Sequence, residues 1–242
     1  MSIGHHAGNL SAPTIVSAET MMHAVLDCGL VPFFENAIAG YSVEEMTDPY
    51  WWFDGEGGVL GPWDWKIDCV QSGDILYGKY LCGGKAAFAT FKWYRELRNY
   101  RQSLPKFALQ PGPQTLVMDY VKEHGAITVK EVRGLLGVKK SAADALLTRL
   151  QMQCRLVIGD ITRVYRGPDL HYSGWQVASF CRPEDLMDSD GFPGAPAGFP
   201  FAVPDKSEDC VHTPEESFNL LSAHITRLTG ETSPRLIAGI LG

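Results

Sequence analysis

The sequence lacks the features that mark membrane-spanning and exported proteins. No window reaches the roughly 18 consecutive apolar residues that a membrane-spanning helix requires. No basic residue precedes the first apolar run at the amino end, where a secretory signal would carry one. We therefore expect a cytoplasmic protein without a membrane partner. Its apolar content of 45% is ample for a hydrophobic core.

The cysteines and histidines lack the spacings of common metal and redox sites. The six cysteines contain no C-x-x-C pair, and the seven histidines form no H-E-x-x-H motif. We therefore expect reduced structural thiols, no metal site and no cofactor. The glycine patterns of phosphate-binding loops, nucleophile elbows and dinucleotide-binding folds are also missing. These patterns leave open whether the protein is an enzyme.

Positive charge is absent from the first quarter of the chain and gathers in the middle. Residues 1–60 carry eight acidic residues and no Lys or Arg, whereas 61–106 have a net charge of +4 and 114–187 of +2. Residues 188–242 have a net charge of −5. A polyanion would be attracted to the middle of the chain and repelled by its ends. The total of −7 argues against tight non-specific binding to DNA.

Residues 107–187 have the pattern of three short helices followed by strands. The first helix, "QTLVMDYVKEHG", has one apolar face and ends at Gly125, and Thr128 with Glu131 forms a capping box for the second. "SAADALLTRLQ" predicts the third helix, and "CRLVIGD", "ITRVYRG" and "GWQVASF" predict strands. This is the order of a winged helix, whose third helix usually enters the major groove.

The predicted third helix and wing carry polar side chains suited to DNA. We expect the helix to bury its leucines, so that the polar side chains of the helix and the wing face phosphates and bases. The candidates are Lys139, Lys140, Thr148 and Arg149 on the helix, and Arg163 and Arg166 on the wing. Asp144 on the same face, together with the small net charge, favours the alternative that this unit docks another protein.

The regions on either side of the winged helix also contain clear local signals. A helix should follow Ser17 and stop at Gly29, and Ser42 with Glu45 forms a second capping-box pattern. "PKFALQPGPQ" is predicted as a linker. We expect an α+β protein with a helical and hairpin region over 1–106, a winged-helix domain over 107–187, and a Pro/Gly-rich segment with terminal helices over 188–242. The other signals are a hairpin at Gly83-Gly84, caps at Thr90, Thr213 and Ser233, and an extended segment over 188–212.

Residues 79–106 form the most basic window, with aromatic residues interleaved. Lys92 and Arg95 lie beside Trp93, Tyr94 and Tyr100. Such a pattern suits the stacking of unpaired bases along a phosphate track. The alternative is that the aromatic residues, at helical spacing, belong to the core.

Four tryptophans lie within fifteen residues, in a stretch predicted as a loop held together by aromatic side chains. A concave aromatic pocket with a carboxylate would suit a flipped base or a small planar ligand. Core packing is the alternative. The candidate pocket residues are Trp51, Trp52, Trp63, Trp65 and Lys66, and Asp64, which its tryptophan neighbours could desolvate, is the candidate catalytic acid.

Five segments resemble a known family: "GPWDWK", "YGKYLCGGKAAFAT", "WYRELRNYR", "TRLQMQ" and "PEESF". They resemble a bacterial family described as AlkZ-related, which is named for a distant likeness to the alkylated-base DNA glycosylase AlkZ. The resemblance covers about 30–230 and implies winged-helix architecture and an association with DNA.

The resemblance also implies a candidate motif. AlkZ-type enzymes use Gln-x-Gln to position a hydrolytic water, and Gln151-Met152-Gln153 has that spelling. Here the motif closes the third predicted helix, whereas in the enzyme it lies early, in the first winged-helix domain. Exposed glutamines at a helix end are the alternative.

The leading hypothesis is a DNA-binding winged-helix protein. The first alternative is a base-excision hydrolase that uses Asp64, or Gln151 and Gln153. The second is a docking module for a protein partner. The hypotheses differ on whether the outer face of 141–153 stays open and positive.

Overall fold

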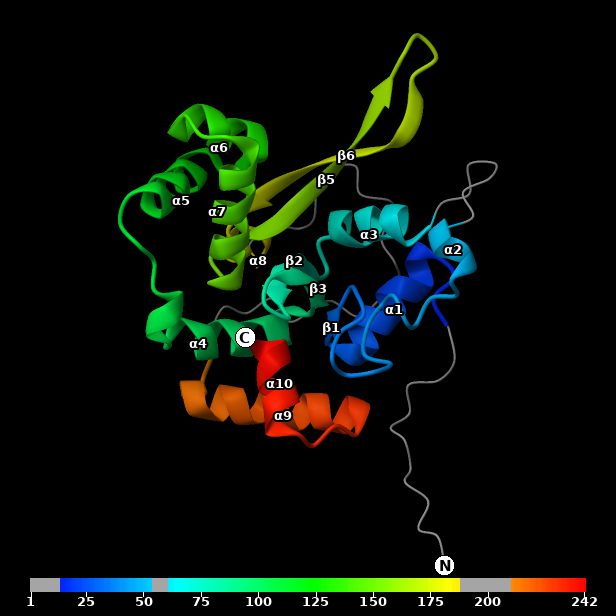
Figure 1. Ribbon diagram of the computed structural model, residues 1–242, viewed down its shortest axis with the longest axis vertical. Helices are drawn as coiled ribbons and strands as arrows, with labels where there is room; N and C mark the ends of the chain where they lie inside the picture. Colours follow the sequence, from blue (N-terminus) through cyan, green and yellow to red (C-terminus); the bar gives the residue numbers. More distant parts are fainter. Residues whose placement is uncertain (1–13, 54–60, 188–209) are drawn as a thin grey trace, which may run out of the picture.

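The computed structural model describes residues 14–53, 61–187 and 210–242, and much of the Pro/Gly-rich segment predicted over 188–212 lies outside them. In this part, ten α-helices and one 3-10 helix surround an antiparallel sheet in the order β1-β3-β2-β5-β6-β4 (Figure 1). The protein is thus α+β, as predicted. The strands are β1 (Leu30–Pro32), β2 (Leu76–Leu81), β3 (Lys85–Ala89), β4 (Ala126–Thr128), β5 (Val157–Arg166) and β6 (His171–Cys181).

Local capping signals set the ends of several helices. Ser17, Thr128 and Thr213 each accept a hydrogen bond from a backbone N–H of the first turn, as predicted. Gly137 and Gly230 end their helices in the left-handed conformation. The helices are α1 (Ala18–Cys28), α2 (Tyr50–Phe53), α3 (Pro62–Gln71), α4 (Phe91–Gln102), η1 (Pro105–Phe107), α5 (Pro113–His124), α6 (Val129–Leu136), α7 (Lys140–Met152), α8 (Pro183–Met187), α9 (Pro214–Thr229) and α10 (Pro234–Leu241).

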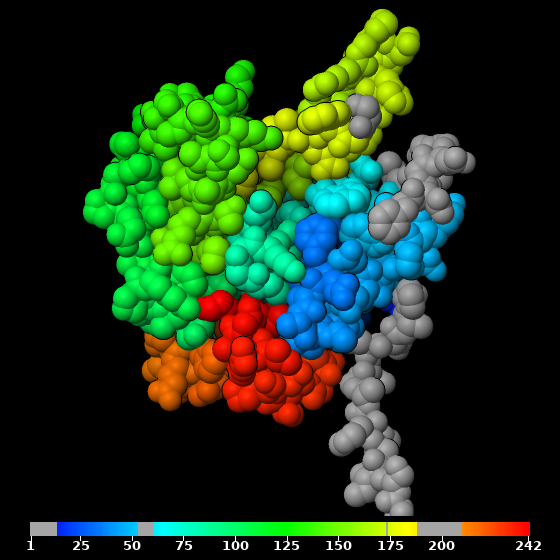
Figure 2. All heavy atoms as spheres, in the orientation of Figure 1, coloured from blue at the N-terminus to red at the C-terminus, as the bar shows by residue number. Residues whose placement is uncertain are grey.

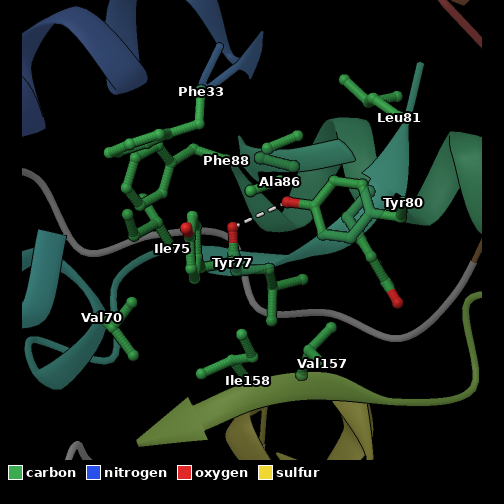
Figure 3. Close-up of a cluster of buried hydrophobic side chains, with 14 of the residues drawn as sticks. Phe33, Val70, Ile75, Tyr77, Tyr80, Leu81, Ala86, Phe88, Val157 and Ile158 are labelled. Carbon is green, nitrogen blue, oxygen red and sulfur yellow. Dashed lines mark hydrogen bonds between the residues drawn. The ribbon is translucent and has the colours of Figure 1, made fainter. Parts of the chain in front are cut away.

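Strand β2 joins the first region of the chain to the second. Tyr77 pairs with Phe88 of β3 on one side and with Ile158 of β5 on the other. The rings of Tyr77 and Phe88 lie 4.6 Å apart, and Phe33, Val157 and Ile158 belong to the same buried cluster (Figure 3). The hairpin of the first region and the β5–β6 hairpin of the second therefore share one sheet and one core.

The structure corrects several predicted elements. The tryptophan-rich stretch is helical where it is described, because Gly61 and Pro62 start α3, which buries Trp65 and Cys69 one turn apart. Strand β4 had no predicted counterpart. Ser42 Oγ accepts a hydrogen bond from the Glu45 backbone N–H and donates one to the Glu45 carboxylate, but around a turn rather than a helix.

The two strands predicted over 154–167 are one continuous strand, β5. Its pairing with β6 shifts register between Ile158 and Asp160. A Cβ at Gly159 would lie 2.5 Å from Cys181 Sγ, so the close approach of β6 requires glycine here. The glycine therefore marks an irregularity within a strand, although a glycine between apolar runs often marks a strand end.

Candidate nucleic-acid interface

Helix α7 is open at its beginning and covered at its end. Lys139 and Lys140 are exposed, whereas Thr148 and Arg149 are half-buried. Arg149 donates a hydrogen bond to the backbone oxygen of Lys106, and its guanidinium lies 5.8 Å from the ring centroid of Phe107. The segment predicted as a linker therefore packs on the helix through Phe107, which is itself buried.

Thr148 faces the turn between β2 and β3. A Cβ at Gly84 would lie 3.2 Å from Thr148 Cγ2, so the two residues are in close contact. Thr148 and Arg149 therefore contact the chain's own β2–β3 turn and η1, whereas we expected both to face outward. Only the first half of α7 keeps the open outer face that the DNA hypothesis requires.

Helix α6, which precedes α7 in the chain, carries two further exposed cations. Lys130 and Arg133 are exposed, and α6 packs directly against α7. Glu131, which lies between them in the sequence, accepts hydrogen bonds from the backbone N–H and the hydroxyl of Thr128. Sequence reasoning missed this pair, although Lys130 and Arg133 are one helical turn apart on the side of α6 away from buried Val132.

The backbone at the start of α7 also suits an anion. Lys139 is the N-cap, and its side chain makes no capping hydrogen bond with the first-turn amides. Such amides and the helix dipole favour negative groups. With Lys139 and Lys140 beside them, they form the most favourable place for a phosphate on this helix.

The β5–β6 hairpin projects from the body of the protein (Figures 1 and 2). Its outer part exposes large apolar side chains: Tyr165 is 54% exposed, Leu170 71% and Trp175 59%. The guanidinium of Arg166, at the end of β5, lies 5.2 Å from the centroid of the Trp175 ring. The outer part of the predicted wing therefore presents an aromatic and cationic surface to solvent.

Ionic and polar contacts hold the inner part of this hairpin against α3. Arg163 donates a hydrogen bond to Asp68 Oδ1 at 3.0 Å, and its Nε lies 3.8 Å from Asp64 Oδ1. Burial opposes the charged form of Arg163, but these two carboxylates raise the pKa of its guanidinium above the ordinary value. Arg163, predicted to contact nucleic acid, is thus occupied in anchoring the hairpin.

Asp64 and Lys66 belong to the same anchor. Tyr172 donates a hydrogen bond to Asp64 Oδ1 at 2.7 Å, and Lys66 Nζ donates to Gln176 Oε1 at 2.8 Å and to the Trp63 carbonyl. Burial lowers the pKa of Lys66 to about 8, although Asp64 opposes this shift. The structure therefore places the candidate acid in a network between α3 and β6.

The four tryptophans pack against other aromatic rings. The ring centroids of Trp51 and Trp65 lie 5.3 Å apart. Trp52 and Trp63 pack on each other, with centroids 5.8 Å apart, and on buried Phe33, at 5.6 and 5.7 Å. Trp63 is nevertheless 46% exposed. The geometry favours the core-packing alternative for this cluster over a ligand pocket.

The aromatic residues of the basic window are also used in packing. Tyr94 is buried, the ring of Trp93 stacks 3.7 Å from that of His224 on α9, and Tyr100 packs on Phe218. Lys92 is exposed and Arg95 half-buried on α4. Helix α4 lies with α9 and α10 at the end of the molecule opposite the hairpin tip (Figure 1), so these two cations are not part of the surface around α7.

Both glutamines of the Gln-x-Gln motif are buried, with exposed fractions of 1% for Gln151 and 0% for Gln153. The alternative of exposed glutamines at a helix end is therefore wrong. Gln153 Nε2 donates hydrogen bonds to the Ala108 carbonyl and to Gln114. Gln151 lies four residues after buried Leu147, a spacing that would have placed it on the inner face of the helix.

The fold and the candidate interface define an α+β protein with a cationic helix start and a projecting aromatic hairpin. A family model described as AlkZ related matches residues 15–242, so the protein belongs to the AlkZ-related family. Comparisons with curated proteins and with solved structures gave no match. None of the helices among the described residues is long and apolar enough to cross a membrane.

Proposed function

We propose that this protein binds duplex DNA through a winged-helix unit formed by residues 107–187. The order α5, α6, α7 and then the β5–β6 hairpin supports this assignment, because a winged helix has three helices followed by a hairpin wing. The family, through its relation to the glycosylase AlkZ, supports DNA as the partner.

The observation that carries the proposal is the set of exposed cations on α6 and at the start of α7. Lys130 and Arg133 are exposed on α6, and Lys139 and Lys140 are exposed at the start of α7, where the N-cap side chain makes no capping hydrogen bond. Phosphates are the groups that such a surface attracts. Arg166 and Trp175 on the hairpin provide a second contact, where an arginine can meet the backbone and an aromatic ring can meet a groove.

The covered end of α7 limits how the proposed complex can read sequence. Thr148 and Arg149 contact the protein's own chain, so they are not free to reach base edges. Phosphate contacts position a protein on DNA but carry no sequence information directly. We therefore expect binding of modest specificity and strong dependence on salt.

The test measures how the affinity for a duplex oligonucleotide falls with added salt, by fluorescence anisotropy of labelled DNA. Each phosphate contact contributes roughly 0.9 to the slope of log affinity against log salt. The Lys139→Ala, Lys140→Ala variant should therefore bind more weakly and reduce that slope by about two.

A matched variant controls for the loss of charge. Lys92→Ala, Arg235→Ala removes two exposed cations from α4 and α10, at the far end of the molecule from the hairpin tip (Figure 1). It should keep the wild-type slope. Equal slopes in all three proteins would overturn the proposed interface, and no salt-dependent binding by the wild type would favour the protein-docking alternative.

A further inference from the structure

Glu96, a buried acid on α4, lies beside the segment that leads into α9. Its Oε1 is 2.9 Å from His212 Nδ1, and its Oε2 is 3.5 Å from Cys210 Sγ. The possible ligand atoms of the three residues all lie within 4.8 Å of one another. More than 110 residues separate Glu96 from the other two, so no sequence spacing indicates that they meet.

The surroundings of Glu96 fit a carboxylate that binds a cation. It is 5% exposed, and within 79–106 it is the single acidic residue among seven bases, yet its ion-pair partner in the described part of the chain is His212. Side chains of Ser217, His212 and Cys210 lie within hydrogen-bonding distance of its two oxygens. The three side chains therefore converge on one buried carboxylate.

We propose that Glu96, Cys210 and His212 bind one zinc ion, which fastens the segment preceding α9 to α4. Zinc accepts thiolate, imidazole and carboxylate ligands together. A thiolate disfavours magnesium and calcium, which prefer oxygen ligands. Because the His212 side chain is 40% exposed, water can supply a fourth ligand.

Zinc binding would change the protonation of two of these residues. The Cys210 thiol releases its proton to solvent. His212 gives up the proton on Nδ1 and carries a single proton on Nε2, by exchange with solvent, so that Nδ1 can donate a lone pair to the metal. Bonds to zinc then replace the hydrogen bonds that these residues make with Glu96.

Outer hydrogen bonds are already in place to orient the proposed ligands. Ser217 Oγ donates to Glu96 Oε2 at 2.6 Å, while Asn99 Nδ2 donates to Ser217 Oγ and to the His212 carbonyl, both at 2.8 Å. Metal-binding carboxylates usually have such partners, which fix the geometry of the site. Zinc at this place would add a tie between α4 and the start of α9, two helices that already pack together.

The test uses the full-length chain, stripped of metal with a chelator and kept reduced. Zinc is titrated in competition with a chromophoric chelator, and cobalt(II) replaces it for absorption spectroscopy. We expect one zinc per chain and, with cobalt, a thiolate charge-transfer band. Cys210→Ser should lose that band, and His212→Ala should bind zinc at least about tenfold more weakly.

Two control variants remove similar residues elsewhere. Cys82 is half-buried like Cys210, and His124 is exposed like His212, so Cys82→Ser and His124→Ala should keep one zinc at the wild-type affinity. The proposal fails if the wild type takes up no zinc or gives no thiolate band. It also fails if the Cys210→Ser, His212→Ala variant keeps the wild-type affinity. The wild-type measurements decide the matter even if a variant does not fold.

Discussion

Replacing Gln151 by alanine should destabilise the protein, because this side chain satisfies a backbone group that the sheet leaves unpaired. Gln151 Oε1 accepts a hydrogen bond from the backbone N–H of Lys79 at 2.9 Å. The β2–β3 pairing shifts register between Gly78 and Leu81, where Lys79 lies. Gln151 thus ties α7 to an irregular stretch of β2.

The size of the effect follows from two losses. An unsatisfied N–H costs about 1–3 kcal/mol, and each buried methylene contributes about 0.8 kcal/mol. Gln151 is 1% exposed, so both losses apply almost in full. We expect Gln151→Ala to lower the free energy of unfolding by about 2–4 kcal/mol. Gln151→Met, which keeps most of the volume, should lose only the hydrogen-bond part, about 1–3 kcal/mol.

The assay is equilibrium unfolding in urea, followed by tryptophan fluorescence. The free energies of two variants are compared only if the slope of the free energy of unfolding against urea concentration is the same in both. Gln102→Ala, at an exposed glutamine on α4, should change the free energy by less than about 0.5 kcal/mol. If Gln151→Ala costs less than about 1 kcal/mol, comparable to an average single substitution, the structural role of Gln151 is refuted.

Two other perturbations test the hairpin anchor and a buried histidine. Arg163→Ala leaves two carboxylates without their cation, so backbone hydrogen exchange at 161–177 should accelerate. Arg166→Ala, the control, should leave this exchange unchanged. Equal effects of the two substitutions would contradict the role of Arg163 in anchoring the hairpin to α3. Burial lowers the pKa of His224 from about 6.5 to about 4. The unfolded chain therefore takes up a proton first as pH falls, and stability present above pH 6.5 should be lost progressively toward pH 4, by up to about 3 kcal/mol. When the free energy of unfolding is measured by urea titration at each pH, His224→Gln should flatten its dependence on pH and His124→Gln should not. An unchanged pH dependence in His224→Gln would exclude His224 as its source.

Local signals in the sequence were sufficient to predict many of the elements. Capping side chains at Ser17, Thr128 and Thr213 act on amides within three residues, so their effect does not depend on distant parts of the chain. The Gly83-Gly84 turn and the alternating strands around it were equally local. The capping-box pattern at Ser42 marks the limit of such signals, because the residues that follow it form a turn and not a helix.

Tertiary contacts decided which of the predicted site residues remain available. Helical periodicity identifies one buried face of α7, but it cannot show that the β2–β3 turn and η1 cover Thr148 and Arg149 from other sides. Likewise, only the folded chain brings Asp68 to Arg163, through a bond that spans 95 residues. Whether a cation can contact a ligand depends on which charges the fold places beside it, and that arrangement is not encoded within any single helix or strand.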